Sequence, residues 1–229
     1  MILFFVDNVE EEKCILAEDE FIHCCKVLRH KENDTINFTN GKGIFGTARI
    51  TEIKKKYALL DVISTEQNQE LGSYTILAVA PPKNRSRWEW LLEKSVEIGV
   101  NTIIPMTSSH SERVNLNIER SKKIMRSAAL QSKRIIHPTV LELTKFANII
   151  TSQDYSNFDK FIAHFNSDNA HLNSYKYSSK NRIILIGPEG DFSQEEVALA
   201  IKNEFVPVNI SNNRLRTETA AIVATNFLV

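Results

Sequence analysis

The spacing of apolar and polar positions changes near residue 70 and predicts two domains. Before that point, short segments rich in β-branched and aromatic residues alternate with turns, at 35–38, 44–50 and 57–63. Asn40-Gly41 lies between the first two segments and favours a tight hairpin in which both turn residues have positive φ. A short helix is expected over 19–28. Several short strands with tight turns predict a small β-barrel over residues 1–70.

From residue 74 the apolar runs become continuous, which is typical of strands that are covered on both faces. Helical segments separate most of these runs. The apolar runs themselves lie at 74–80, 102–104, 161–163, 183–186 and 205–210. The alternation predicts a mainly parallel α/β sheet within residues 71–229, with its ligand site at the carboxyl ends of the strands.

Two helical segments carry surface features that suggest a partner. The segment 87–98 has an apolar stripe of Trp88, Leu91, Leu92 and Val96, and its opposite face carries Arg87, Trp90, Lys94 and Glu97. Trp90 beside two cations can stack on a nucleobase, or it can pack on another domain or a second subunit. The segment 118–134 is basic over most of its surface and is the best candidate for contacts with phosphates.

Two motifs mark points where an apolar strand ends and a helix begins, at 184–193 and 213–221. Such junctions expose backbone N–H groups and are suited to hold a polar ligand. Their closeness in the sequence predicts one shared site. Ser193 and Glu196 form the pattern of a capping box and predict a helix start there. That pattern leaves open whether a ligand uses the preceding loop.

Composition limits the class of protein. The chain has 229 residues, is 42% hydrophobic and 24% charged, and its net charge is zero, which is typical of a soluble globular protein. Residues 81–137 carry 11 Lys or Arg and 5 Asp or Glu, which indicates either an anionic partner or a solvated helical face. Three cysteines without a CxxC pair favour a reducing compartment, so a cytoplasmic location is expected. No apolar stretch approaches transmembrane length.

Two patterns suggest cofactors but lack the required context. Residues 41–46 match GxGxxG, yet strand-like sequence follows, so we predict a hairpin and no dinucleotide site. His23, Cys24 and Cys25 lack the paired spacing of a tetrahedral metal site. We therefore expect no metal.

The motifs GPEG at 187–190 and LRTETA at 215–220, taken together, resemble the RsmE family of small-subunit rRNA uridine-N3 methyltransferases. The family belongs to the SPOUT superfamily and uses S-adenosylmethionine. The match runs nearly end to end and includes EIGV at 97–100 and QSKR at 131–134. The chain departs from the family pattern at Leu130, Asp191 and Asn213, where the family usually has Glu, Gly and Arg.

The resemblance implies an RNA-binding, PUA-like β-barrel at 1–70 and a SPOUT-type α/β domain at 71–229. It also implies a deep trefoil knot, a homodimer and an S-adenosylmethionine site held largely by backbone groups. The residues implied to bind the cofactor are His164, Leu185, Ile186, Gly187, Pro188, Glu189, Gly190, Val208, Asn209, Ile210, Ser211, Leu215, Arg216, Thr217, Thr219 and Ala220.

Methylation of uracil N3 requires that the N3 proton leaves and that the resulting anion is stabilised. Arg216 is the candidate for the stabilising role. Glu189 or Glu218 can take the proton, although a carboxylate at a helix start can equally act as a cap. The resemblance implies that the partner is 16S rRNA of the small ribosomal subunit. The residues expected to contact it are Arg29, Lys83, Arg87, Lys94, Arg113, Arg120, Lys123 and Arg134.

Two other functions compete with this one. The first is a protein that binds RNA without catalysis, and the intact pair of motifs argues against it. The second is a SPOUT methyltransferase that acts on tRNA, which the nearly full-length resemblance disfavours.

Overall fold

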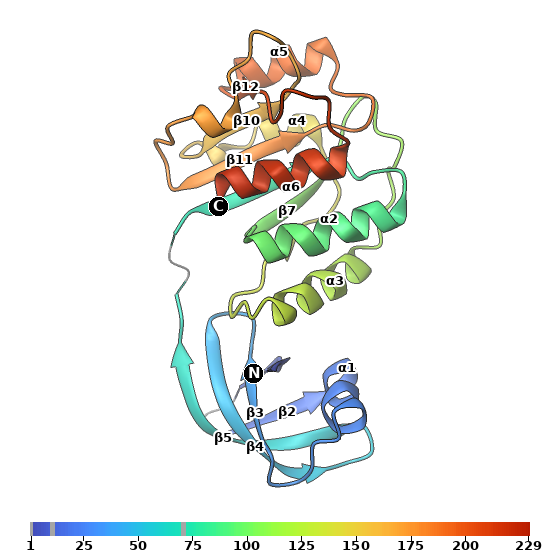
Figure 1. The fold of residues 1–229 in the computed structure, drawn as a ribbon, viewed down its shortest axis with the longest axis vertical. Coiled ribbons are helices and arrows are strands. Elements are labelled where there is room, and N and C mark those ends of the chain that lie inside the picture. Colours follow the sequence, from blue (N-terminus) through green and yellow to red (C-terminus); the bar gives the residue numbers. More distant parts are fainter. Residues whose placement is uncertain (1, 10–11, 70–71) are drawn as a thin grey trace. The chain divides into compact units, whose positions relative to one another are not determined.

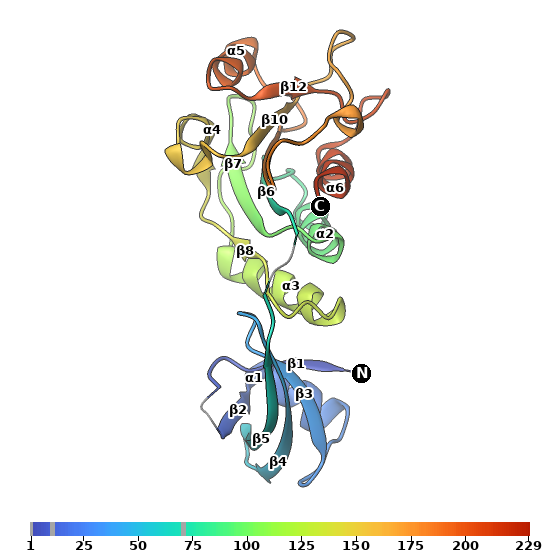
Figure 2. The same ribbon diagram turned by 90° about the vertical axis from the view of Figure 1, so that its left-hand side faces the viewer.

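The computed structural model describes residues 2–9, 12–69 and 72–229 and divides into two compact units (Figures 1 and 2). The first unit comprises the described residues up to 69 together with Ala129–His137. The second comprises Gly72–Ala128 and Pro138–Val229. Among the described residues, no helix is both long and apolar enough to span a membrane.

The first unit is built on a five-stranded sheet in the order β1-β3-β4-β5-β2. Its strands are β1 (Leu3–Phe5), β2 (Lys13–Ala17), β3 (Thr35–Thr39), β4 (Ile44–Ile53) and β5 (Tyr57–Gln67). The pair β4–β5 shifts register twice, and both strands bend strongly (Figure 1), so the sheet curls into a half-barrel. A short helical segment follows β2, with α1 (Glu18–Phe21) continuing as η1 (Ile22–Val27). These findings agree with the predicted β-rich domain and short helix.

The β3–β4 hairpin forms where Asn40-Gly41 predicts it, and it contains the GxGxxG pattern. Its geometry differs from the prediction. Positive φ occurs at Gly41 (70°) and Gly43 (105°), not at Asn40. The Asn40 Oδ1 instead accepts hydrogen bonds from the N–H groups of Lys42 (2.8 Å) and Ile44 (3.0 Å). The amide side chain satisfies these donors, so the turn is longer than two residues.

Residues 129–137 belong to the first unit, although the sequence assigned them to the second. The Thr39 hydroxyl donates to the carbonyl of Ile135 at 2.9 Å, and the His137 ring stacks on Phe5 with centroids 5.4 Å apart. A Cβ at Gly41 would lie only 2.8 Å from His137 Nδ1, so this contact requires glycine. Contacts between residues so distant in the chain leave no trace in hydrophobic periodicity.

The second unit contains a seven-stranded sheet in which every pairing is parallel, as predicted. The strand order is β12-β10-β11-β6-β7-β8, and β9 pairs with β7. The strands are β6 (Tyr74–Val79), β7 (Thr102–Thr107), β8 (Thr139–Val140), β9 (Thr144–Lys145), β10 (Asp159–Ala163), β11 (Asn181–Ile186) and β12 (Val206–Val208). The carboxyl ends of β10, β11 and β12 meet at one edge.

Helices cover both faces of this sheet (Figure 2). The helical segments are α2 (Arg85–Ile98), α3 (Ile118–Gln131), α4 (Phe146–Ile150), η2 (Gln153–Tyr155), η3 (Leu172–Ser174), α5 (Gln194–Lys202) and α6 (Thr217–Leu228). Phe146 of α4 and Ala200 of α5 pack on one face, in a core with Ile104 and Leu185. Helices α2 and α6 pack together on the other face. The predicted stripe of α2 is buried, and Trp90 on its other side is 44% exposed.

Candidate active site

A cavity of about 350 Å³ opens in the second unit at the carboxyl ends of β10, β11 and β12. It is lined by Ala163, His164, Phe165, Ile186, Gly187, Pro188, Glu189, Asp191, Val208, Ile210, Ser211, Asn213, Arg214, Leu215, Arg216, Thr217 and Ala220. This is the sheet edge at which the strand pattern places a ligand.

The two strand-to-helix motifs meet at this cavity. The buried Thr217 hydroxyl, in the first turn of α6, donates to the carbonyl of Gly187 after β11 at 3.1 Å. Residues of both motifs line the cavity walls. The prediction that the motifs share one location is therefore confirmed, because one hydrogen bond joins them directly.

The loop after β11 turns at Asp191, which has a φ of 64°. Its N–H donates to the carbonyl of Pro188 at 3.0 Å, and its Oδ1 accepts from the N–H of Phe192 at 2.8 Å. The left-handed backbone explains why glycine suits this position, and aspartate is among the residues that tolerate it. The other oxygen, Oδ2, lies 3.6 Å from His164 Nδ1. The departure from the family pattern thus adds a carboxylate to the cavity wall.

The predicted capping box at the start of α5 is confirmed. The Ser193 hydroxyl accepts from the N–H of Glu196 at 3.2 Å, and Glu196 Oε2 accepts from the N–H of Ser193 at 2.9 Å. Glu196 Oε1 also accepts from the N–H of Ser109 at 2.8 Å. The box therefore ties the loop after β11 to the loop after β7.

Gly187 has a packing role that the sequence did not reveal. An added Cβ would lie 3.1 Å from Cδ2 of Phe192, a buried core residue. A larger side chain at Gly187 would therefore disturb the loop through Phe192, and its effect on a ligand would be indirect. For this reason a substitution at Ala220, which lines the cavity, tests ligand binding better than one at Gly187.

Twelve of the sixteen residues implied to bind a cofactor line the cavity. The other four, Leu185, Gly190, Asn209 and Thr219, do not. The sequence also missed five lining residues, which are Ala163, Phe165, Asp191, Asn213 and Arg214. Ala163 and Phe165 flank His164, whereas Asp191, Asn213 and Arg214 lie within the two motifs, so counting every residue of both motifs would have found three of the five.

The three candidate catalytic residues have different surroundings. Arg216 is exposed, lines the cavity as the N-cap residue of α6, and makes no ion pair with another described residue. Glu189 is exposed and lines the cavity, and its Oε1 accepts from the N–H of Lys83 at 3.3 Å. Glu218 is buried outside the cavity lining, with Oε1 3.5 Å from Arg87 Nε. Glu189 is thus better placed than Glu218 to take a proton.

The basic residues proposed for RNA fall in both units, and Lys83, Arg87, Lys94 and Arg120 lie against carboxylates. Lys83 contacts Glu112, and Lys94 contacts Glu93 and Glu97. Arg113 is different, since its guanidinium donates to the carbonyls of Pro82 and Asn115. Arg29 and Arg134 belong to the first unit, and Lys123 is exposed on α3. Solvent-exposed ion pairs contribute little free energy, so RNA phosphates can compete for these cations.

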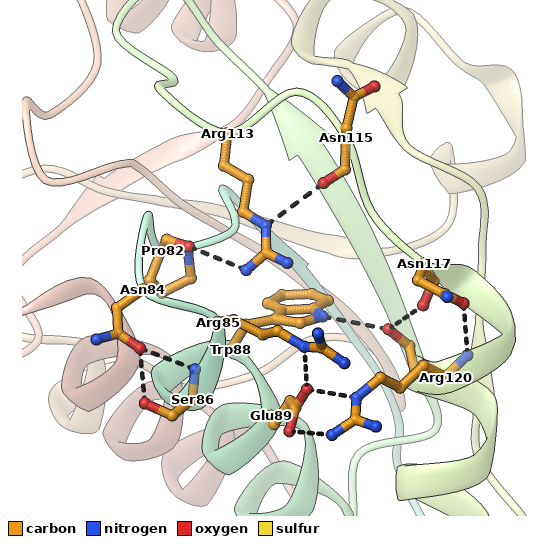
Figure 3. A network of polar contacts seen from close by, with 11 residues as sticks. Pro82, Asn84, Arg85, Ser86, Trp88, Glu89, Arg113, Asn115, Asn117 and Arg120 are labelled. Carbon is orange, nitrogen blue, oxygen red and sulfur yellow. Dashed lines mark hydrogen bonds and ion pairs between the residues drawn. The ribbon is translucent and has the colours of Figure 1, made fainter.

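Arg120 is held in a network that the sequence did not predict (Figure 3). Its Nε and Nη2 donate to the two oxygens of Glu89 at 2.6 and 2.9 Å, and Arg85 Nε donates to Glu89 at 2.7 Å. Nearby, the Trp88 indole donates to the Ser121 hydroxyl at 3.2 Å and links α2 to α3. The two guanidinium groups, Arg120 first, lower the pKa of Glu89 to about 2. This geometry favours a structural role for Arg120.

We expect the Glu89 network to stabilise the fold in a pH-dependent manner. The pKa of the Glu89 carboxyl group is lowered in the folded state. The stabilisation is therefore complete above the usual pKa of a carboxyl group, and it is lost as pH falls toward about 2. Glu89→Gln should therefore lower Tm at neutral pH and reduce the further fall in Tm on acidification. Thermal unfolding measured across this range, with Glu93→Gln as control on the same helix, tests this. Parallel pH profiles for the Glu89 variant and the wild type would contradict it.

Comparisons with known proteins agree with this architecture. A family model described as RNA methyltransferase domain matches residues 69–229, and one described as RNA methyltransferase PUA domain matches residues 16–63. The ribosomal RNA small subunit methyltransferase E of Rickettsia conorii is 30% identical, over 94% of this chain and 88% of that protein.

Solved structures give the same result. A probable rRNA-methyltransferase from Porphyromonas gingivalis has a TM-score of 0.92 and 33% identity, covering 100% of this chain and 97% of that one. The ribosomal RNA small subunit methyltransferase E from Neisseria gonorrhoeae, bound to S-adenosyl methionine, has a TM-score of 0.86 and 28% identity. The match covers 98% of this chain and 95% of that one. The fold and cavity are thus those of an RNA methyltransferase with a PUA domain. The chain belongs to the ribosomal RNA small subunit methyltransferase E family, which confirms the resemblance seen in the sequence.

Proposed function

We propose that this chain methylates N3 of one specific uridine in 16S rRNA, with S-adenosylmethionine as the methyl donor. The observation that carries the proposal is the single cavity formed by the two motifs, joined by the Thr217–Gly187 hydrogen bond. Membership in a family of small-subunit rRNA methyltransferases supports the substrate class.

The cavity residues fit S-adenosylmethionine. A volume of about 350 Å³ lies in the range of small-molecule sites, roughly 300–1,000 Å³. Ile186, Val208 and Ile210 give an apolar wall, and strand-end loops surround it with backbone polar groups. Among the described residues, the buried His164 Nδ1 has no hydrogen-bond partner, with Asp191 Oδ2 nearby at 3.6 Å, so a ligand can provide one. When bound, the cofactor supplies an electrophilic methyl group.

The chain's own residues prepare the uracil for this reaction. Methyl transfer forms a bond from N3 to the methyl carbon and breaks the sulfur–methyl bond, and the N3 proton must leave. Glu189 is assigned to accept that proton, because its carboxylate is exposed at the cavity. Arg216 is assigned to stabilise the negative charge that develops on the uracil. The target nucleotide has to be splayed out of its stack to reach them.

The proposal includes three further features that follow from the family resemblance. They are a trefoil knot in the second unit, a homodimer and a cytoplasmic location. The exposed Trp90 on α2 offers an apolar surface for a second subunit. Sedimentation at micromolar concentrations measures the dimer directly.

Mass spectrometry of RNA from a strain that lacks the gene tests the proposed function. We expect 3-methyluridine to disappear from 16S rRNA and to return when the wild-type gene is restored. Loss of a tRNA modification instead would identify a tRNA methyltransferase. Unchanged RNA in the deletion strain, together with RNA binding by the purified protein, would favour a binding protein without catalysis.

We expect α3 to contact rRNA phosphates through Lys123 and Arg126, which are both exposed. The double variant Lys123→Glu/Arg126→Glu should weaken binding to 30S subunits. It should also lower the slope of log affinity against log salt by about one unit for each lost contact. Lys176→Glu/Lys180→Glu makes the same charge change at other exposed positions and should leave the slope unchanged. Equal slopes for the wild type and the α3 variant would exclude this contact.

A further inference from the structure

A second cavity of about 420 Å³ lies in the second unit and shares a wall with the first. It is lined by Lys83, Asn84, Arg87, Glu112 and Glu189. Glu189 lines both cavities. A group held in the second cavity would therefore lie next to a ligand in the first, with the Glu189 carboxylate beside both. That is the arrangement that transfer between two bound molecules requires.

The amide of Asn84 has a fixed orientation in this cavity (Figure 3). Asn84 is the N-cap of α2, and its Oδ1 accepts from the N–H and the hydroxyl of Ser86 at 2.8 and 2.6 Å. A flipped amide would lose the cap, because Nδ2 cannot accept a hydrogen bond. The exposed Nδ2 makes no hydrogen bond with any described residue. Asn84 thus offers the cavity a donor and no free acceptor.

The neighbouring side chains add further donors, and two carboxylates, Glu112 and Glu189, line the cavity with them. The Lys83 ammonium lies 2.7 Å from Glu112 Oε2, and the Lys83 N–H donates to Glu189 Oε1 at 3.3 Å. Arg87 Nε lies 3.5 Å from the buried Glu218 Oε1, which anchors the guanidinium at the cavity wall. The lining therefore combines several donors with the exposed Glu189 acceptor, while the Glu112 carboxylate is paired with the Lys83 ammonium.

This pattern complements the Watson–Crick edge of uracil. That edge presents the O2 and O4 carbonyl acceptors on either side of the N3–H donor, whereas cytosine has an amino group in place of O4. Proteins that read an unstacked base form hydrogen bonds to this edge. A donor beside a carboxylate suits O4 and N3–H, while a donor facing the amino group of cytosine would be left without an acceptor.

We infer that the second cavity takes the target uracil and that Asn84 Nδ2 donates to uracil O4, which makes Asn84 a specificity-determining residue. This inference rests on the proposed function. It adds a residue that no motif singled out. Its physical basis is that the helix cap fixes which end of the amide faces the base.

Asn84→Asp tests the inference, because aspartate keeps the cap but replaces the donor with an acceptor. The probes are 30S subunits assembled with in vitro transcribed 16S rRNA, carrying uridine or cytidine at the methylated position. We expect the single-turnover rate on the uridine subunits to fall roughly ten- to a hundredfold. For this variant, the dissociation constant for cytidine-containing subunits divided by that for uridine-containing subunits should fall toward one. Tm and S-adenosylmethionine affinity should stay at wild-type values.

Asn117→Asp is the matched control. Asn117 caps α3, where its Oδ1 accepts from the N–H of Arg120 at 2.9 Å, and it does not line the cavity. This control should leave the rate and the base preference unchanged. An unchanged cytidine-to-uridine ratio in Asn84→Asp would overturn the inference, whether or not the rate falls. If the wild-type protein methylates neither kind of subunit, the proposed function itself fails. If only the inference about Asn84 fails, the wild-type protein still methylates the uridine-containing subunits.

Discussion

Replacing Arg216 with alanine is expected to lower the single-turnover rate of methyl transfer roughly a hundredfold or more, the scale for loss of one preorganised charge-stabilising donor. Arg216 lines the cavity at the N-terminus of α6, and its guanidinium forms no ion pair with the described residues. It is therefore available to the uracil as negative charge develops. Because that charge is absent from the neutral uracil as it first binds, the rate should change far more than the affinity for S-adenosylmethionine or RNA.

Arg216→Lys serves as the control for this variant. It keeps the charge but not the planar fork of donors, so it should recover only part of the rate. The measurement is a single-turnover experiment at saturating cofactor and 30S subunits. A rate near wild type in Arg216→Ala, accompanied by a lower Tm or weaker cofactor binding, would show that Arg216 only holds the loops together.

Ala220→Leu is expected to weaken S-adenosylmethionine binding roughly ten- to a hundredfold or more, as for side chains forced into occupied space. Ala220 lies in the second turn of α6 and lines the cavity of about 350 Å³. Leucine is a strong helix former, so α6 should persist while the added carbons enter the cavity. Isothermal titration calorimetry with the full-length protein measures the change.

Ala198→Leu provides the matched control, since Ala198 is exposed on α5 and does not line the cavity. This variant should bind S-adenosylmethionine with wild-type affinity. Wild-type affinity in a folded Ala220→Leu protein would mean that the cofactor binds elsewhere. Thermal unfolding of both variants separates a filled cavity from a damaged fold.

The sequence by itself determined the features that depend on local patterns. Continuous apolar runs identified the parallel strands, because strands buried on both faces need no polar alternation. Ser193 and Glu196 fixed the start of α5, because the capping box closes within four residues. The two strand-end motifs also indicated a shared site, since parallel strands carry their carboxyl ends to one edge.

Only the tertiary structure decided the features that depend on distant partners. The attachment of residues 129–137 to the first unit rests on Thr39, Gly41 and Phe5, which are far away in the chain. Glu189 and Glu218 are alike in the sequence, yet one is exposed at the cavity and the other is buried beside Arg87. Arg120 is held by Glu89 from another helix. Exposure and pairing of a charged side chain depend on which elements pack around it, and a local pattern contains no information about those neighbours.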